Sequence, residues 1–87
     1  MKHKGEMLNV LHATDWDGTG QVQPILDFLG EDLISHETGS QPHWQTGEPQ
    51  TVHTFTFSRD TRDTHAHGVG FRAGFVVNCE TILAEEV

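Results

Sequence analysis

Apolar residues recur along the chain with two different periods, and the period indicates which segments form strands and which form helix. Residues 8–13 are apolar on both alternating sets, which is typical of a strand in the middle of a sheet or beneath a helix. Residues 52–57 alternate, with His53, Phe55 and Phe57 on one face and threonines on the other. We therefore expect two strands of one sheet, with the phenylalanines pointing inward.

The cleanest alternation lies near the C-terminus, where one face would carry Phe71, Ala73, Phe75 and Val77. This pattern predicts a strand over residues 71–77. Asn78 then suits a helix cap, because its side-chain oxygen can accept a hydrogen bond from an unpaired amide, and this predicts a short helical turn up to Leu83. Residues 64–67 fit either a strand or a loop.

One segment has the period of a helix, with a stripe formed by Val22, Ile25, Leu26 and Leu29. Pro24 is tolerated only in a first turn, so the helix should begin near residues 21–23, and Gly30 suits its C-terminal cap. Together the elements predict a single α+β domain over residues 1–87, in which one helix packs on a small, mostly antiparallel sheet of three to five strands. The sheet should be lined by Phe55, Phe57, Phe71 and Phe75.

Residues 37–50 follow no sustained period and carry two glycines, two prolines and many polar residues. We expect a long, mobile loop at residues 37–50. Its large apolar residue, Trp44, either folds back onto the core or stays exposed for a partner. The alternatives matter, because a tryptophan that becomes buried on binding is a strong interface anchor.

The composition adds a strong acidic charge, since 13 Asp and Glu against five Lys and Arg give a formal net charge of −8. Such a charge repels phosphates and anionic lipid heads, so direct binding of nucleic acid or of a membrane is disfavoured. No apolar run approaches the about 20 residues that cross a bilayer, and residues 1–6 lack the apolar core of a secretory signal. We therefore expect a cytoplasmic protein.

One motif raises the possibility of catalysis. Residues 15–19, Asp-Trp-Asp-Gly-Thr, follow an apolar strand and resemble motif I of haloacid-dehalogenase-type phosphotransferases. The resemblance implies a nucleophile at Asp15 and a general acid and base at Asp17. That chemistry also needs a lysine further along the chain, whereas the lysines here are Lys2 and Lys4, and 87 residues are too few for a doubly wound sheet. We interpret the motif as a turn and expect no enzyme.

Seven histidines suggest a different chemistry. His65 and His67 would share one side of a strand, with His53 as a neighbour, so a zinc-binding or small enzymatic domain is an alternative. Zinc needs at least three ligands, and we expect no cofactor unless the three histidines converge. The lone cysteine, Cys79, has no adjacent Lys or Arg to favour a thiolate, and we expect a buried, inert thiol.

The overall layout resembles that of small accessory proteins encoded by bacteriophages and prophages. The shared features are an opening strand that ends in a Trp-Asp-Gly turn, an Ile-Leu-x-Phe-Leu-Gly helix, a variable loop, and a Gly-Phe strand before a short C-terminal segment. Here they fall at residues 10–19, 25–30, 37–50 and 74–87. Because most such proteins have no assigned function, the resemblance implies a setting inside a host cell and no catalytic residue.

Small size, excess carboxylates and an incomplete catalytic set lead us to expect a non-enzymatic interaction protein that binds and modulates a host protein, for example as an inhibitor. The candidate contact residues are Asp27, Glu31, Asp32, Glu37 and Trp44. A basic or nucleic-acid-binding host protein would suit the charge, and a surface that mimics DNA is a sharper version of this hypothesis. A structural virion component is a further alternative, and an exposed edge strand would allow a homodimer.

Overall fold

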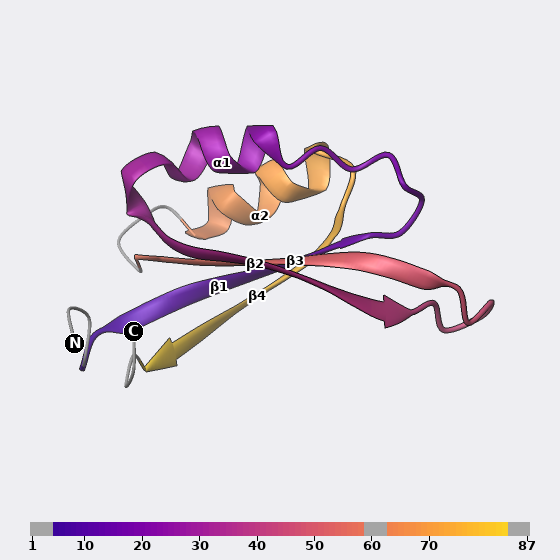
Figure 1. Ribbon diagram of the computed structural model, residues 1–87. Coiled ribbons are helices and arrows are strands. Elements are labelled where there is room, and N and C mark those ends of the chain that lie inside the picture. Colours follow the sequence, from indigo (N-terminus) through magenta and orange to yellow (C-terminus); the bar gives the residue numbers. More distant parts are fainter. Residues whose placement is uncertain (1–4, 59–62, 84–87) are drawn as a thin grey trace.

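The computed structural model describes residues 5–58 and 63–83, in which a four-stranded sheet carries two helices (Figure 1). The elements are β1 Met7–Asp15, α1 Gln23–Leu29, a 3-10 turn at Gly30–Asp32, β2 Leu33–Pro42, β3 Pro49–Ser58, α2 Asp63–Arg72 and β4 Val76–Leu83. In these ranges neither helix has the length and apolar character to cross a membrane. The α+β class, the antiparallel sheet and the first helix are confirmed.

The order of strands in the sheet is β2-β3-β1-β4, and every neighbouring pair is antiparallel. Each β-α-β crossover therefore passes over one strand: β1-α1-β2 passes β3, and β3-α2-β4 passes β1. This is the ferredoxin-like, or split β-α-β, arrangement. Both helices lie on the same face of the sheet, and none of the described elements covers the other face (Figure 1).

The core lies between the helices and the covered face of the sheet. Ile25 and Leu29 of α1 belong to one buried cluster with Leu11 of β1 and with Phe55 and Phe57 of β3, and each of these residues is at most 1% exposed. The strand register explains the grouping, because Leu11 is paired directly with Phe55. Burial of each such side chain stabilises the fold by about 1.5–3 kcal/mol. The helical stripe and the inward phenylalanines of β3 are thus confirmed.

Residues 63–72 form a helix, where alternation predicted a strand over residues 71–77 and a strand or loop before it. The packed stripe of α2 consists of small residues at helical spacing, namely Ala66, Val69 and Gly70, and Ala73 directly after the helix continues it. Small residues contribute little to a hydrophobic pattern, which is why the helix was missed. Phe71 falls outside this stripe and is 70% exposed, so its predicted place in the core is wrong, whereas Phe75 is buried as expected.

Residues 76–83 continue as strand β4, so the helical turn predicted after Asn78 is wrong. Val77 and Cys79 are paired with Ala13 and Leu11 on the helix-covered face of the sheet. Pairing with β1 along eight residues supplies far more contacts than one side-chain cap, and this tertiary pairing overrides the local preference.

The long mobile loop predicted at residues 37–50 is also wrong, because most of this segment is a β-hairpin. β2 and β3 remain paired up to Pro42 and Pro49, which leaves only residues 43–48 in the turn. The hairpin extends beyond the helices (Figure 1), and residues 36–42 are exposed. A hairpin that buries neither face needs no apolar alternation, so its sequence carries no strand period.

Close backbone contacts join the loop after β1 to the turn between α2 and β4. The amide of Gln21 donates to the carbonyl of Ala73 at 2.9 Å. Gly74 has a φ of +96°, and a Cβ on Gly20 would lie only 2.5 Å from the ring of Phe75, so both positions favour glycine. These contacts hold residues 19–21 beside residues 73–75, directly before β4.

Candidate interaction surface

Four large apolar side chains are exposed at one end of the sheet. Trp44 is 85% exposed, Phe71 70%, Val76 57% and Trp16 55%. They belong to the β2-β3 turn, the end of α2, the start of β4 and the loop after β1. Figure 1 shows these segments in the right-hand half of the molecule, where the β2-β3 turn projects furthest. We call these four residues the tryptophan surface.

Two hollows show that the tryptophan surface is continuous. The larger has a volume of about 540 Å³ and is lined by Trp16, Phe71 and Val76 together with the buried Phe75. The smaller, of about 260 Å³, is lined by Trp16, Val76 and Trp44. Because Trp16 and Val76 line both hollows, the four exposed side chains adjoin one another and can be covered by a single partner.

A third hollow, of about 310 Å³, gives this region a negative border. Trp16 lines it as well, with the carboxylates of Asp15, Asp17 and Glu48. The hydroxyl and the amide of Thr19 donate to Oδ1 of Asp17 at 2.6 and 3.0 Å, and these bonds lower the pKa of Asp17 below its usual value. Asp17 is therefore ionised at neutral pH, directly beside an exposed indole ring.

The loop that carries Trp16 is held in place by hydrogen bonds. Oδ1 of Asp15 accepts from the amide of Gly20 at 2.9 Å, and the side-chain amide of Gln50 donates to the carbonyl of Trp16 at 3.2 Å. Asp15 and Asp17 thus stabilise the chain reversal, in agreement with the interpretation of residues 15–19 as a turn. A backbone that is already ordered loses less entropy when a partner binds.

Trp44 does not fold back onto the core, and of the two alternatives for this residue the structure has the exposed one. Its ring stacks on His43, with centroids 6.1 Å apart and planes inclined by 14°. Nδ1 of His43 accepts hydrogen bonds from the amides of Gln45 and Thr46 at 3.0 and 3.3 Å. The hairpin turn therefore presents Trp44 on an ordered support.

The acidic residues predicted as partner contacts do not lie with Trp44. Asp27 is on α1 and Glu31 and Asp32 are in the following 3-10 turn, at the opposite end of the molecule in Figure 1. Glu37 lies on β2, paired with Thr54, on the face that the helices leave open. Closeness in sequence was misleading here, because the five predicted residues form no single patch.

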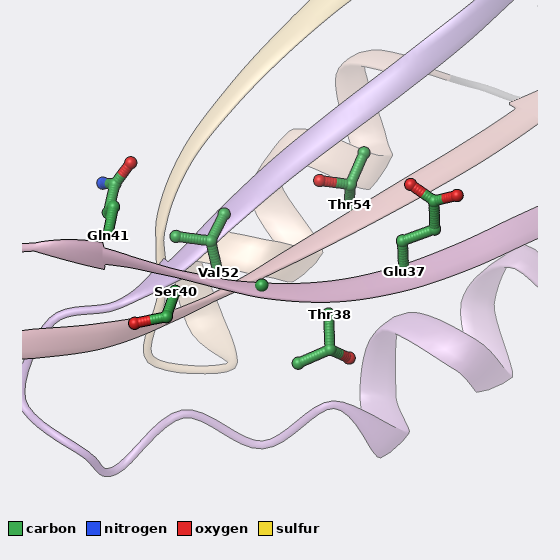
Figure 2. A pocket seen from close by; sticks show the side chains of 7 residues that line it. Glu37, Thr38, Ser40, Gln41, Val52 and Thr54 are labelled. Carbon is green, nitrogen blue, oxygen red and sulfur yellow. The ribbon is translucent and has the colours of Figure 1, made fainter.

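A shallow hollow on the hairpin surrounds Glu37. Its lining residues are Glu37, Thr38, Gly39, Ser40, Gln41, Val52 and Thr54. Figure 2 shows Glu37, Gln41, Val52 and Thr54 pointing to one side of the hairpin, and Thr38 and Ser40 to the other. Of these described lining residues only Glu37 has an ionisable side chain, so the hollow brings together no acid-base pair.

The three histidines predicted to form a metal site are not brought together. His65 and His67 are two residues apart on a helix, which separates them by about 200° around its axis. The prediction that they share one side of a strand is therefore wrong. His53 instead contacts His36, and in the part of the chain that the structure describes no three His, Cys, Asp or Glu side chains are grouped to hold a metal ion.

The His36–His53 pair joins β2 to β3 and was missed from the sequence, because the register of residues 37–50 was not predicted. Nε2 of His36 and Nδ1 of His53 are 3.1 Å apart. His36 stacks on Phe55 with centroids 4.4 Å apart, and His53 meets Phe75 edge-on. Burial and the neighbouring His36 lower the pKa of His53, against a smaller opposing effect of Asp15.

Sequence reasoning identified one residue of the tryptophan surface, Trp44, and missed three. Phe71 and Val76 were assigned to a core strand, and Trp16 was read only as part of a turn. Comparison of this chain with protein-family models, with curated proteins and with solved structures found no match. The case for the surface therefore depends on its geometry.

Proposed function

We propose that this chain is a non-enzymatic binding protein that docks on a host protein through the tryptophan surface. The observation that supports the proposal is the continuous group of four large apolar side chains that are 55–85% exposed. Covering apolar area favours association by about 25 cal/mol per Å², and buried tryptophans dominate the energetics of many interfaces. The fold itself gains little from these side chains where they are.

Asp15, Asp17 and His43, three of the ionisable residues beside the surface, have structural roles, which favours binding over catalysis as the function. Asp15 and Asp17 accept hydrogen bonds within the turn, and His43 accepts two backbone amides in the hairpin. The layout that resembles phage accessory proteins favours a partner among the proteins of the host cytoplasm. The net charge of −8 favours a basic one.

Photo-cross-linking tests this proposal. A photoreactive amino acid at the exposed position Gln45, beside Trp44, would be activated in bacterial host lysate. We expect discrete adducts that weaken at least tenfold in a Trp16→Ala/Trp44→Ala variant whose circular dichroism is unchanged. Adducts of equal intensity in that variant would contradict the proposal.

The chain offers a matched control for this experiment. Met7 and Leu83 are also exposed apolar residues, 42% and 52%, and they are paired with each other at the other end of β1 and β4. A Met7→Ser/Leu83→Ser variant also replaces two exposed apolar residues, at the end of the sheet away from the tryptophan surface. We expect it to give the same adducts as the wild type.

A further inference from the structure

The acidic hollow beside Trp16 indicates which kind of partner segment the tryptophan surface accepts. Three carboxylates line this hollow, those of Asp15, Asp17 and Glu48. No Lys or Arg is among the described residues that line any of the three hollows around Trp16. A partner that covers this region without supplying a cation would leave the carboxylates uncompensated as water is excluded.

The acidic hollow and the apolar hollows adjoin one another. Trp16 and Asp17 line both the acidic hollow and the 540 Å³ hollow, while Trp16, His43 and Gln50 line both the acidic hollow and the 260 Å³ hollow. A short segment that crosses Trp16 therefore meets apolar walls and carboxylates within a few residues. A cation beside an indole ring gains from the ring as well as from the carboxylates, and arginine suits such a place best.

We propose, on the premise of the proposed function, that the partner segment carries two large apolar side chains and an adjacent arginine or lysine. The apolar side chains occupy the two hollows that share Trp16 and Val76, and the cation lies between the Trp16 ring and the carboxylates of Asp17 and Glu48. A second copy of this chain is a poorer occupant, because each copy has a net charge of −8 and symmetric pairing would bring the same carboxylates together.

The test uses fluorescein-labelled nine-residue peptides in which Phe and Leu, separated by one to three Ser residues, are followed by Arg, citrulline or Glu. Citrulline keeps the shape of arginine and removes its charge. By fluorescence polarisation at low salt, we expect at least one Arg peptide to bind five times more tightly than its citrulline counterpart. The Glu peptide should bind most weakly, and the difference between Arg and citrulline should shrink in high salt.

Two variants locate the cation. Asp17→Asn/Glu48→Gln keeps an oxygen that can accept from Thr19. It should reduce the ratio of Arg to citrulline affinity below two, chiefly by weakening the Arg peptides. The matched control, Asp27→Asn/Glu31→Gln, removes the same charge at the far end of α1. It should leave the ratio intact.

The outcomes separate this inference from the proposed function. Peptide binding that Trp16→Ala abolishes, but that does not distinguish Arg from citrulline, overturns the inference and leaves the docking role of the tryptophan surface standing. An equal effect of both double variants also overturns it, since only the overall charge would matter. The inference is also wrong if every peptide binds the wild type no more tightly than it binds the Trp16→Ala variant. It is wrong as well if the wild type sediments as a dimer that the Trp16→Ala substitution dissociates. In either case the cross-linking experiment decides the proposed function separately.

Discussion

Trp44 and Phe55 are both aromatic residues of the β2-β3 hairpin, yet their substitution should have opposite consequences. Phe55 is fully buried, so Phe55→Ala should lower the free energy of unfolding by about 3–5 kcal/mol. Trp44 is 85% exposed, and Trp44→Ala should change it by less than about 0.5 kcal/mol. Urea denaturation followed by circular dichroism measures both values. If Phe55→Ala does not fold, Phe55→Leu should lower the free energy of unfolding by a smaller amount. A decrease above about 1.5 kcal/mol for Trp44→Ala would show that Trp44 contributes to the stability of the fold.

The lowered pKa of His53 should make the free energy of unfolding depend on pH. Burial and His36 lower the pKa of His53 in the folded protein, so as the pH falls the unfolded chain binds a proton first. The stabilisation is therefore complete above the ordinary histidine pKa of 6.5 and is lost as the pH falls through the lowered value. The slope for this one proton is at most about 1.4 kcal/mol per pH unit.

A pH series of urea denaturation from 7.5 to 5 checks this expectation. His53→Gln should flatten the decline, because the substituted side chain takes up no proton in that range. His65→Gln is the control, since His65 is exposed on α2 and contributes no comparable burial. Identical slopes for the wild type and His53→Gln would assign the pH dependence to other groups.

At the scale of the element, two glycines of α2 provide a paired test of how the helix packs. Alanine is a better helix former than glycine by about 1 kcal/mol. A Cβ at Gly68 would meet only the flexible end of the Arg72 side chain, at 3.4 Å. Gly68→Ala should therefore raise the free energy of unfolding by up to about 1 kcal/mol. A Cβ at Gly70 would lie 2.6 Å from Cγ1 of Val77 and 3.6 Å from Leu11. Gly70→Ala should therefore lower stability by about 1–3 kcal/mol.

The melting temperatures of the two alanine variants, measured by thermal denaturation, test these opposite effects. A gain for both would mean that α2 does not approach β4 as closely as the Gly70 contact requires. The opposite signs expected here depend on tertiary contact alone, because both substitutions raise helix propensity equally.

The same elements explain what the sequence could predict. β1, β3 and α1 were predicted because their large apolar side chains repeat at the period of the element and are buried in the core. α2 was missed because its buried stripe is made of small residues. The outer part of the β2-β3 hairpin was missed because it buries neither face. The tryptophan surface could not be predicted, since it joins four segments that only the order of strands brings together.

At the scale of the whole molecule, acidic residues lie at both ends, beside the tryptophan surface and at the far end of α1. Asp27, Glu31 and Asp32 lie at the far end of α1, whereas the tryptophan surface lies at the end of the sheet with the hairpin turn (Figure 1). Among residues 5–58 and 63–83, Arg72 is the sole Lys or Arg. Exposed charges at a distance steer a basic partner and raise its association rate, while the apolar contacts set its rate of dissociation. Under the proposed function, we expect the acidic residues first considered as contacts to act by long-range attraction.

The excess of negative charge should also make the fold more stable when salt is added. Like charges on a compact chain repel one another, and the Debye length falls from about 30 Å at 0.01 M to about 3 Å at 1 M. If screening recovers about 1 kcal/mol, the melting temperature of a domain of this size rises by about 4–8 °C. The variant Glu31→Gln/Asp32→Asn/Glu37→Gln takes the net charge from −8 to −8 + 3 = −5 and replaces only exposed residues. The melting temperature of this variant should be higher than that of the wild type in low salt and should rise less with NaCl. Parallel rises in the two proteins would instead indicate that salt acts generally on apolar burial and that self-repulsion in the native fold is small.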